Sequence, residues 1–458
     1  MSANLSEILT KSETDHVSAT DVSGWHILTD ILAALDRSTV EYVILGDTTR
    51  FPDLTSGDVD LAIGADDFAK LEAVLVQLQD ESPARLVQVI EHEQTSRFYV
   101  LAWKGPAGRP QYLQLDVCSD YFRSGTLLMT ADEFIGEREN HTIHGADVYL
   151  PSREAALTYY LIKKIEKGSI SVEQNEYLLS TLSRMTEPQR ADVASRFGFP
   201  DAAEFGSWIK DLASSKNAAK PGATFKPNTR TTIVHRLREV ARLIRRVASP
   251  NGLFVVLMGP DGSGKTTINN LSREYTETAF WGVRYLHFRP FLGISGDDDD
   301  IVEDPHAEPP RGTLSSIAKL AYYVFDYALG YLTKIRPCLS RSGLVIFDRY
   351  YEDMQIDQRR YRYGGPRFLL NLARWFVPTP DLYVFLDGDA NVIQSRKQEV
   401  SFAETERQVD AYRTLASALP NAELCDASLE PEDVAICVSW KILDMLSDKT
   451  IQRIGGKV

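Results

Sequence analysis

The feature that most constrains this chain is Gly259-Pro-Asp-Gly-Ser-Gly-Lys-Thr266, which directly follows the apolar run Leu253–Met258. The run is short and rich in β-branched residues, which is typical of a central strand buried on both faces. The motif fits G-x-x-x-x-G-K-[ST], in which backbone N–H groups point at phosphate oxygens. Lys265 can reach the β- and γ-phosphates, Thr266 can ligate Mg²⁺, and we expect a helix to open at Thr266. The pattern predicts an ATP·Mg²⁺ site formed by Gly259, Asp261, Gly262, Ser263, Gly264, Lys265, Thr266 and Thr267. A chance match is disfavoured because a predicted strand precedes the motif and a predicted helix follows it.

Length and composition predict a globular protein of two or three domains. The chain has 458 residues, 43% of them hydrophobic, and a formal charge of −14, which argues against general coating of nucleic acids. No apolar stretch approaches the roughly 18 residues of a membrane span, and the N-terminus lacks the pattern of a signal peptide. The cysteines form no C-x-x-C pair and indicate free thiols in a reducing compartment. We therefore expect a cytoplasmic protein, and a homodimer is compatible with the sequence.

Beyond residue 250, strands and helices alternate, which predicts a parallel sheet covered by helices on both faces. The predicted strands are 253–258, 284–288, 344–347, 381–386 and 422–425. Asp348 and Arg349 end one of these strands beside the phosphate-binding motif. Asp348 could hold Mg²⁺ or its waters, and Arg349 could clamp a phosphate; a surface ion pair is the plainer alternative.

Basic residues border a short segment after the strand 381–386. A helix is expected over 390–397, a loop over 398–403, and a further helix from Glu404. Arg396, Lys397 and Arg407 lie at the edges of this segment, which predicts a lid over the triphosphate.

The phosphate motif, Asp348-Arg349-Tyr350, Pro380-Asp-Leu-Tyr-Val-Phe-Leu-Asp387 and the Arg396-Lys397 edge together resemble thymidylate kinase-like P-loop kinases over about residues 250–447. The resemblance implies phosphoryl transfer from ATP·Mg²⁺. Lys265 would hold phosphate, Thr266 and Asp348 the metal, and Arg349 the acceptor phosphate. Asp261 would lie where the loop meets the acceptor, and Arg396, Lys397 or Arg407 would stabilise the transition state.

Two departures bear on the acceptor. The family has Arg-Glu-Pro-Gly-Gly after its second strand, whereas this chain has 287–293 followed by an acidic tract at 297–300, which we interpret as a disordered loop. The segment Gln358–Gly365 is more basic and aromatic than the family pattern. It indicates a phosphate-rich nucleotide, sugar or glycan-type acceptor, with a solvated basic loop as the alternative.

The N-terminal part carries a second set of acidic residues. A strand over 40–45 ends at Gly46-Asp47, and alternation over 58–63 places Asp58 and Asp60 on one strand face. Asp116 lies near the end of a strand over 111–117. Carboxylates this close repel one another, and divalent metal ions would explain why they are tolerated.

This arrangement resembles the nucleotidyltransferase fold of the polymerase-β type. The resemblance implies that Asp58, Asp60 and Asp116 hold two Mg²⁺ ions and that Gly46 approaches a triphosphate. Asp47 departs from the family, which has Gly-Ser or Gly-Gly there, so the transfer activity is either retained or lost. Lys163 and Lys164, on a helix predicted from residue 151, could neutralise a phosphate; we favour a solvated helix face for both.

The sequence predicts an α/β chain with four segments. These are a disordered tail (1–22), a nucleotidyltransferase-like domain with a helical extension (23–212), a linker with a basic helix (213–250) and a P-loop domain (251–458). The basic amphipathic helix over 234–247 could lie on an anionic membrane surface. We favour packing between the domains with its arginines outward.

Three functions remain open on sequence alone. The leading one is an ATP-dependent kinase that acts on a small-molecule or glycan-type phosphorylated acceptor. The second is nucleotidyl transfer with the P-loop domain as a regulator, and the third is a non-catalytic nucleotide sensor. Intact Lys265, Thr266, Asp348 and Arg349 favour the first, and Asp47 counts against the second.

Overall fold

The N-terminal half is built on a five-stranded sheet in the order β1-β2-β5-β4-β3. The computed structural model describes residues 22–46, 48–54, 57–123, 126–167, 170–212, 229–290, 308–398 and 400–455. The strands are β1 (Tyr42–Leu45), β2 (Val59–Ile63), β3 (Arg85–Glu93), β4 (Ser96–Lys104) and β5 (Pro110–Cys118). β2 and β5 run parallel and the other neighbours antiparallel. The predicted strands are thus confirmed, and β5 lies beside β2 as expected for Asp116.

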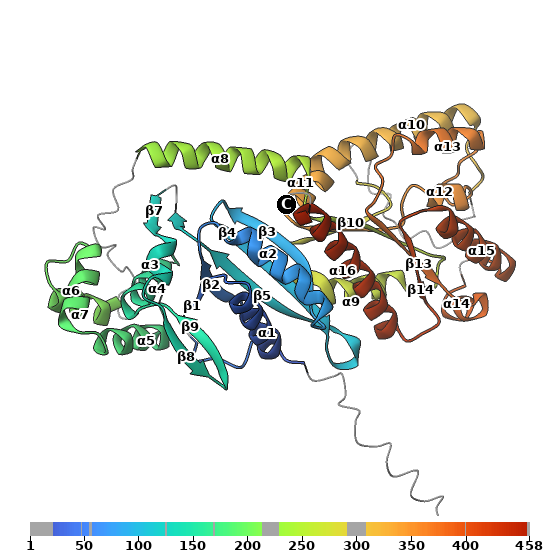
Figure 1. The fold of residues 1–458 in the computed structure, drawn as a ribbon. Coiled ribbons are helices and arrows are strands. Elements are labelled where there is room, and N and C mark those ends of the chain that lie inside the picture. Colours follow the sequence, from blue (N-terminus) through green and yellow to red (C-terminus); the bar gives the residue numbers. More distant parts are fainter. Residues whose placement is uncertain are drawn as a thin grey trace, which may run out of the picture.

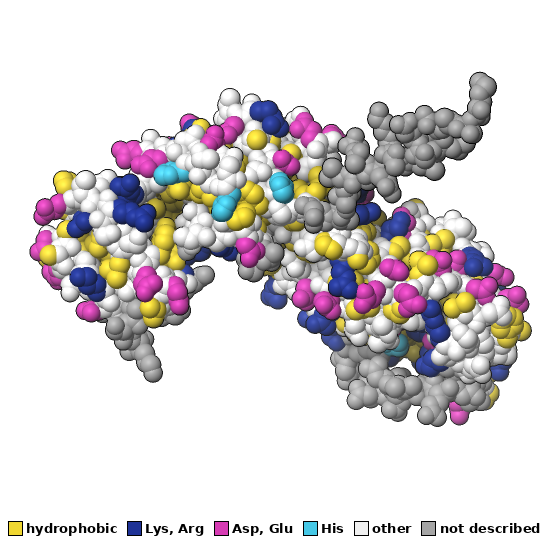
Figure 2. Space-filling view, turned by 90° about the horizontal axis from the view of Figure 1, so that it is seen from below, with side chains coloured by type: hydrophobic (Ala, Val, Ile, Leu, Met, Phe, Trp, Pro, Cys, Tyr) yellow, Lys and Arg dark blue, Asp and Glu magenta, His cyan; other side chains and the backbone are white. Residues whose placement is uncertain are grey.

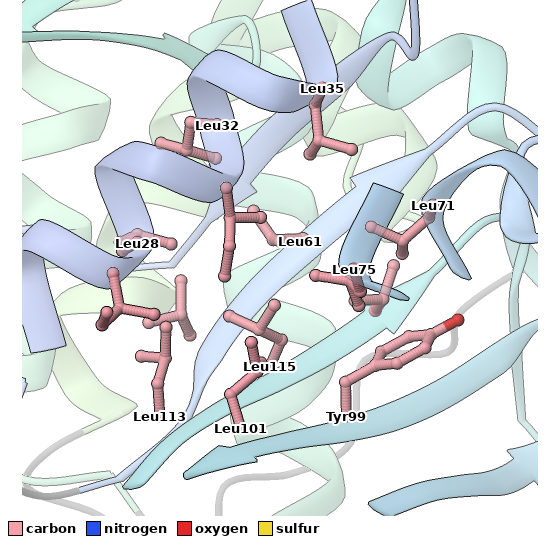
Figure 3. Close-up of a cluster of buried hydrophobic side chains, with 14 of the residues drawn as sticks. Leu28, Leu32, Leu35, Leu61, Leu71, Leu75, Tyr99, Leu101, Leu113 and Leu115 are labelled. Atoms are coloured by element: carbon pink, nitrogen blue, oxygen red, sulfur yellow. The ribbon is translucent and has the colours of Figure 1, made fainter. Parts of the chain in front are cut away.

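One face of this sheet is covered by α1 (Gly24–Arg37) and α2 (Phe68–Gln77). Figure 3 shows leucines of both helices meeting Leu61, Tyr99 and Leu115 of the strands. The helices are amphipathic, and burying one apolar stripe on the sheet removes it from water. This packing fixes the register of β2 and so the face to which Asp60 points.

Further elements follow β5 and include a helical extension. They are β6 (Tyr121–Arg123), β7 (Thr126–Met129), α3 (Ala131–Ile135), β8 (Glu139–Ile143), β9 (Ala146–Leu150), α4 (Arg153–Lys167), α5 (Val172–Ser183), α6 (Glu187–Arg196) and α7 (Ala202–Leu212). A capping box begins α6, because Gln189 Oε1 accepts from the Thr186 N–H at 2.8 Å.

The C-terminal half is a five-stranded sheet, parallel throughout, in the order β11-β12-β10-β13-β14. Its strands are β10 (Leu253–Met258), β11 (Val283–His287), β12 (Leu344–Asp348), β13 (Leu382–Asp387) and β14 (Ala422–Asp426), which confirms the five predicted strands within one residue at each end. Its helices are α9 (Lys265–Thr276), α10 (Thr313–Gly330), α11 (Arg336–Ser340), α12 (Asp353–Ile356), α13 (Arg367–Arg374), α14 (Ala390–Arg396), α15 (Phe402–Ala418) and α16 (Pro431–Gly455), and a π-helical turn (Tyr331–Ile335) joins α10 to α11. α9 begins at Lys265, one residue before the predicted start.

The two sheets share a hydrophobic core across α16. Val87, Val100 and Ala102 of the N-terminal sheet cluster with side chains of β10 and α16. Figure 1 shows α16 between the two sheets. Thr450 Oγ1 donates to Val87 O at 3.0 Å, and Tyr112 Oη donates to Tyr275 O at 2.6 Å. Buried apolar area and buried hydrogen bonds cross the junction between the two halves. The halves are therefore held together by this interface as well as by the chain that connects them.

The basic helix is α8 (Thr229–Ala248), and it spans the two halves along one edge of the molecule (Figure 1). Arg242 donates to Glu91 O of β3, and Arg246 Nε donates to Ser340 O at 3.1 Å. Packing between the halves is confirmed. The expected outward orientation holds for Arg236, Arg238 and Arg245, which are exposed. It is wrong for Arg242, which is buried while Ile244 is 63% exposed.

Several expectations from the sequence concern segments outside the described residues. They are the N-terminal tail (1–21), Asp47, the linker (213–228) and the acidic tract (297–300). Within the described residues, no helix combines the length and the hydropathy that crossing a bilayer requires. On the face in Figure 2, described positive and negative side chains are interspersed. The four cysteines are free.

Candidate functional site

The loop between β10 and α9 has the backbone that the phosphate motif predicts. Gly264 has φ 86° and precedes the first residue of α9, so it turns the chain into the helix. A Cβ on Gly262 would lie 2.7 Å from the carbonyl oxygen of Ile393 and 3.2 Å from Cβ of Lys397. Glycine is therefore required there for the loop to pass beneath α14. The buried Ser263 Oγ has no hydrogen-bond partner among the described residues.

Lys265 is buried at the base of this loop. Its Nζ donates to the carbonyl oxygens of Gly259 and Pro260, both at 2.9 Å, and lies 3.7 Å from Asp261. Burial, and then the Arg349 guanidinium, lower the pKa of Lys265 against the opposing pull of nearby carboxylates. The ammonium is thus held by weak partners that a phosphate oxygen could replace.

Asp348 ends β12 beside the strand that feeds the loop. It lies opposite Leu257 of β10 in the parallel register. Its Oδ2 accepts from Tyr285 Oη at 3.1 Å, while the buried Oδ1 has no partner among the described residues. An unpaired buried carboxylate oxygen is costly. A hydrated Mg²⁺ would satisfy it, so the residues fit the predicted metal.

Arg349 lies in a buried network of charges. Its Nη1 donates to Asp353 Oδ2 at 2.8 Å, and its Nη2 and the Arg360 guanidinium both pair with Asp261 of the loop. Tyr361 Oη donates to Asp353 at 2.6 Å. Burial alone would lower the pKa of Arg349, but Asp353 and Asp261 outweigh it and raise the pKa well above the usual arginine value.

Sequence reasoning assigned Arg349 to a phosphate but missed the network. The opposite charges of Arg349 and Asp353, four residues apart, were an available signal. A turn in which the Asp353 N–H donates to Tyr350 O at 3.0 Å brings the pair together. The alternative of a solvated loop over 358–365 is wrong for Arg360, which pairs with the loop, and for Tyr361, which stacks on Phe288 at 4.4 Å between ring centroids.

The three basic residues at the edges of the expected lid contact different parts of the protein. Lys397 packs against Gly262 of the phosphate loop. Arg396 Nη1 donates to Ala427 O at 2.7 Å, and Arg407 donates to Glu404 and, at 3.2 Å, to Ile356 O. Thr266 and Thr267 are exposed at the start of α9. Catalytic roles for Arg396 and Arg407 stay predictions.

In the N-terminal half, the structure brings the three predicted carboxylates together. One oxygen each of Asp58, Asp60 and Asp116 lies within 4.8 Å of the others, and Asp60 stands opposite Asp116 in the β2–β5 register. A Cβ on Gly46 would lie 3.6 Å from Asp60 Oδ2, so the turn that was expected at a triphosphate borders this cluster. Oxygen donors at this spacing suit Mg²⁺.

Lys163 of α4 enters this cluster, so the expectation of a solvated helix face is wrong. Its Nζ donates to both carboxylate oxygens of Asp60 at 2.7 Å. Burial by itself would lower the pKa of Lys163, but Asp60, followed by Asp116 and Asp58, raises it. The neighbouring Lys164 lies over the ring of Tyr160 at 4.9 Å.

Comparisons with known proteins concern the C-terminal half. Residues 257–434 match the family model "Thymidylate kinase". A thymidylate kinase of Xanthomonas campestris pv. campestris (strain B100) is 29% identical over 216 residues, which cover 45% of this chain and 89% of the relative. One from Marinomonas sp. (strain MWYL1) is 28% identical over 197 residues, 40% of this chain and 90% of the relative.

Proposed function

We propose, from the premise that the C-terminal half is a thymidylate kinase-like P-loop domain, that the protein transfers the γ-phosphoryl group of ATP to a phosphorylated acceptor. The observation that carries the proposal is the position of two groups at the same end of the sheet. Lys265 follows the loop after β10, and the Asp348 oxygen that has no partner among the described residues ends the neighbouring parallel strand β12. Ligands of open α/β sheets bind at the carboxyl ends of the strands, where both groups lie.

The donor end of the reaction follows from the loop. The backbone amides after Gly259 and the N-terminus of α9 would hold the β- and γ-phosphates. Lys265 would exchange its two carbonyl partners for phosphate oxygens, which are stronger acceptors. Thr266 and Asp348 would hold Mg²⁺, which neutralises charge on the transferred group.

The acceptor end follows from the Arg349 network. Arg349 and Arg360 present two guanidiniums at Asp261, the loop residue expected to meet the acceptor. An acceptor phosphate could compete with this single carboxylate for both guanidiniums. Two planar, permanently charged donors suit a doubly charged phosphate better than a neutral hydroxyl.

The acceptor's organic part is a nucleotide or a sugar phosphate. Tyr361, which stacks on the buried Phe288, is partly exposed and offers an aromatic ring next to Asp353. Aromatic rings stack on both bases and sugars, so this ring supports a cyclic acceptor without choosing between them. The match to thymidylate kinases favours a nucleotide.

The test uses ATP labelled at the γ- or the α-phosphate, with Mg²⁺ and a panel of nucleoside monophosphates and sugar phosphates. We expect only γ-label to reach an acceptor, and Lys265→Ala to lower that rate by about 10²–10³-fold. Lys70→Ala, an exposed lysine remote from the loop, is the matched control. Failure of every panel member to take label, with ATP still bound, would favour a nucleotide sensor.

A second candidate function is nucleotidyl transfer in the N-terminal half. The clustering of Asp58, Asp60 and Asp116 beside Gly46 supports it. Lys163 weighs against it, because its ammonium takes both oxygens of Asp60. Transfer of α-label to an acceptor, lost in Asp58→Asn/Asp60→Asn, would make this site the working one.

A further inference from the structure

Helix α8 contacts the rest of the protein through its polar side. The buried Arg242 pairs with Glu239 and reaches the carbonyl of Glu91, while Arg246 reaches Ser340. The Gln94 N–H donates to Glu239 at 3.0 Å. Charged and hydrogen-bonded groups thus fix the inner side of the helix. In most surface helices the apolar side, and not the polar side, packs against the protein.

The opposite side of α8 is apolar and exposed. Its residues and exposed fractions are Leu237 66%, Val240 54%, Leu243 50%, Ile244 63% and Val247 55%. Positions 237, 240, 244 and 247 recur at helical spacing and form one stripe, which we call the α8 stripe. Leaving several adjacent large apolar side chains in water is unfavourable, and such a patch marks an interaction surface.

Arginines border the α8 stripe on both sides. At 100° per residue, Arg236 falls on one border, and Arg238 and Arg245 fall on the other; all three are exposed. Within the described side chains of α8, from residue 236 to residue 248, the acidic one is Glu239, which is turned inward. The outer surface is therefore an apolar strip between two positive edges.

This charge pattern excludes a second copy as the natural occupant. Two α8 helices packed stripe to stripe would place arginines opposite arginines at both edges, and like charges at such flanking positions oppose pairing. The occupant must be apolar in the middle and anionic at its borders. We propose that the α8 stripe docks the protein on the surface of a membrane that contains anionic lipids.

The geometry fits a helix that lies in the plane of the bilayer surface. The exposed segment is about 18 Å long at 1.5 Å per residue. Its apolar side chains would enter the acyl boundary, and the arginines would extend along the surface to lipid phosphates.

The neighbouring surface favours a membrane over a single acidic partner helix. Arg336 anchors Val247 O, so the end of α8 adjoins the turn that follows α10. Leu332 in that turn and Phe325 of α10 are 65% and 54% exposed. Figure 1 shows α8 and α10 along the same edge of the molecule. A single partner helix would cover only the α8 stripe. The extended apolar interior of a membrane surface could also receive Leu332 and Phe325.

The experiment is co-sedimentation of the full chain with vesicles, without nucleotide. Phosphatidylcholine alone is compared with phosphatidylcholine mixed with phosphatidylglycerol. We expect at least ~10-fold stronger partition onto the anionic vesicles, weakened by added NaCl. Ile244→Glu should lower it by about tenfold or more, and each of Arg238→Gln and Arg245→Gln by about fivefold. Val172→Glu, which alters an equally exposed apolar residue of α5, should bind as the unmodified chain does.

Circular dichroism and kinase turnover show whether each variant is folded; if Ile244→Glu is not, the two arginine variants decide. The proposal is overturned if the unmodified chain ignores anionic vesicles, or if Ile244→Glu binds them equally well. It is also overturned if the chain forms dimers, or binds an acidic helical peptide, through the α8 stripe but not vesicles.

Discussion

The two candidate sites have different charge balances. In the C-terminal site, Lys265, Arg349 and Arg360 face Asp261, Asp348 and Asp353. In the N-terminal site, the carboxylates of Asp58, Asp60 and Asp116 face the ammonium of Lys163. A balanced site can admit an anion together with Mg²⁺, because both partners find opposite charge. A site with excess carboxylate gains more from a cation. Carboxylates and basic side chains in different proportions thus prepare the two halves for different ligands.

The contrast between the charge balances of the two sites holds only if Asp348 is essential to the C-terminal site. Asp348→Asn should lower kinase turnover by about 10²–10³-fold and raise the Mg²⁺ concentration needed, because a carboxylate that would hold the metal or its water is lost. Turnover measured over a Mg²⁺ series tests this. Asp410→Asn, an exposed aspartate of α15, is the control. Normal Mg²⁺ dependence in Asp348→Asn would remove Asp348 from the metal site.

The charge balance of the C-terminal site also contributes to the free energy of unfolding. Asp353→Asn leaves the buried Arg349 short of a partner, which should cost about 3–5 kcal/mol in the free energy of unfolding by urea. Burial would raise the pKa of Asp353, but Arg349 and the two tyrosines lower it. A lowered folded-state pKa stabilises the protein above the unfolded pKa, near ~4 for aspartate.

The difference between the unmodified chain and Asp353→Asn should therefore be full at neutral pH and shrink as the pH falls below that range. Urea titrations at several pH values measure it. A difference that stays constant into acid would mean that the ionised Asp353 does not stabilise the fold.

Removing the ammonium of Lys163 tests whether the N-terminal site has an excess of negative charge. Lys163→Met should lower the free energy of unfolding in EDTA by about 1–3 kcal/mol, because the carboxylates then repel one another. Added Mg²⁺ should restore the loss if the cluster binds metal. Lys164→Met is the matched neighbour control. Equal stability of Lys163→Met and the unmodified chain in EDTA would show that this ion pair contributes nothing.

The smallest expected effect tests whether the two sites act separately. Asp58→Asn/Asp60→Asn should change kinase turnover less than about twofold, since additivity holds for distant sites that share no partners. Steady-state turnover with saturating ATP measures it. A large fall would instead show coupling across the shared core, in which Tyr112 of β5 contacts the end of α9.

Patterns local in the chain were predicted well. The phosphate loop and the strand that ends at Asp348 follow from short apolar runs and turn residues, whose backbone preferences act over a few residues. The acidic cluster could be predicted too, because alternation along a strand fixes which side chains share a face.

What the sequence alone determined is therefore the order of the elements and the residues at the ends of the strands. Only the tertiary structure decided that Lys163 meets Asp60, 103 positions away, and that Arg360 meets Asp261. It also decided that α8 turns Arg242 and Arg246 inward and leaves its apolar side exposed. Helical periodicity marks two faces but does not say which one meets the protein. Long-range ion pairs depend on how the whole chain returns to the site, because electrostatic attraction acts between positions in space and not along the sequence.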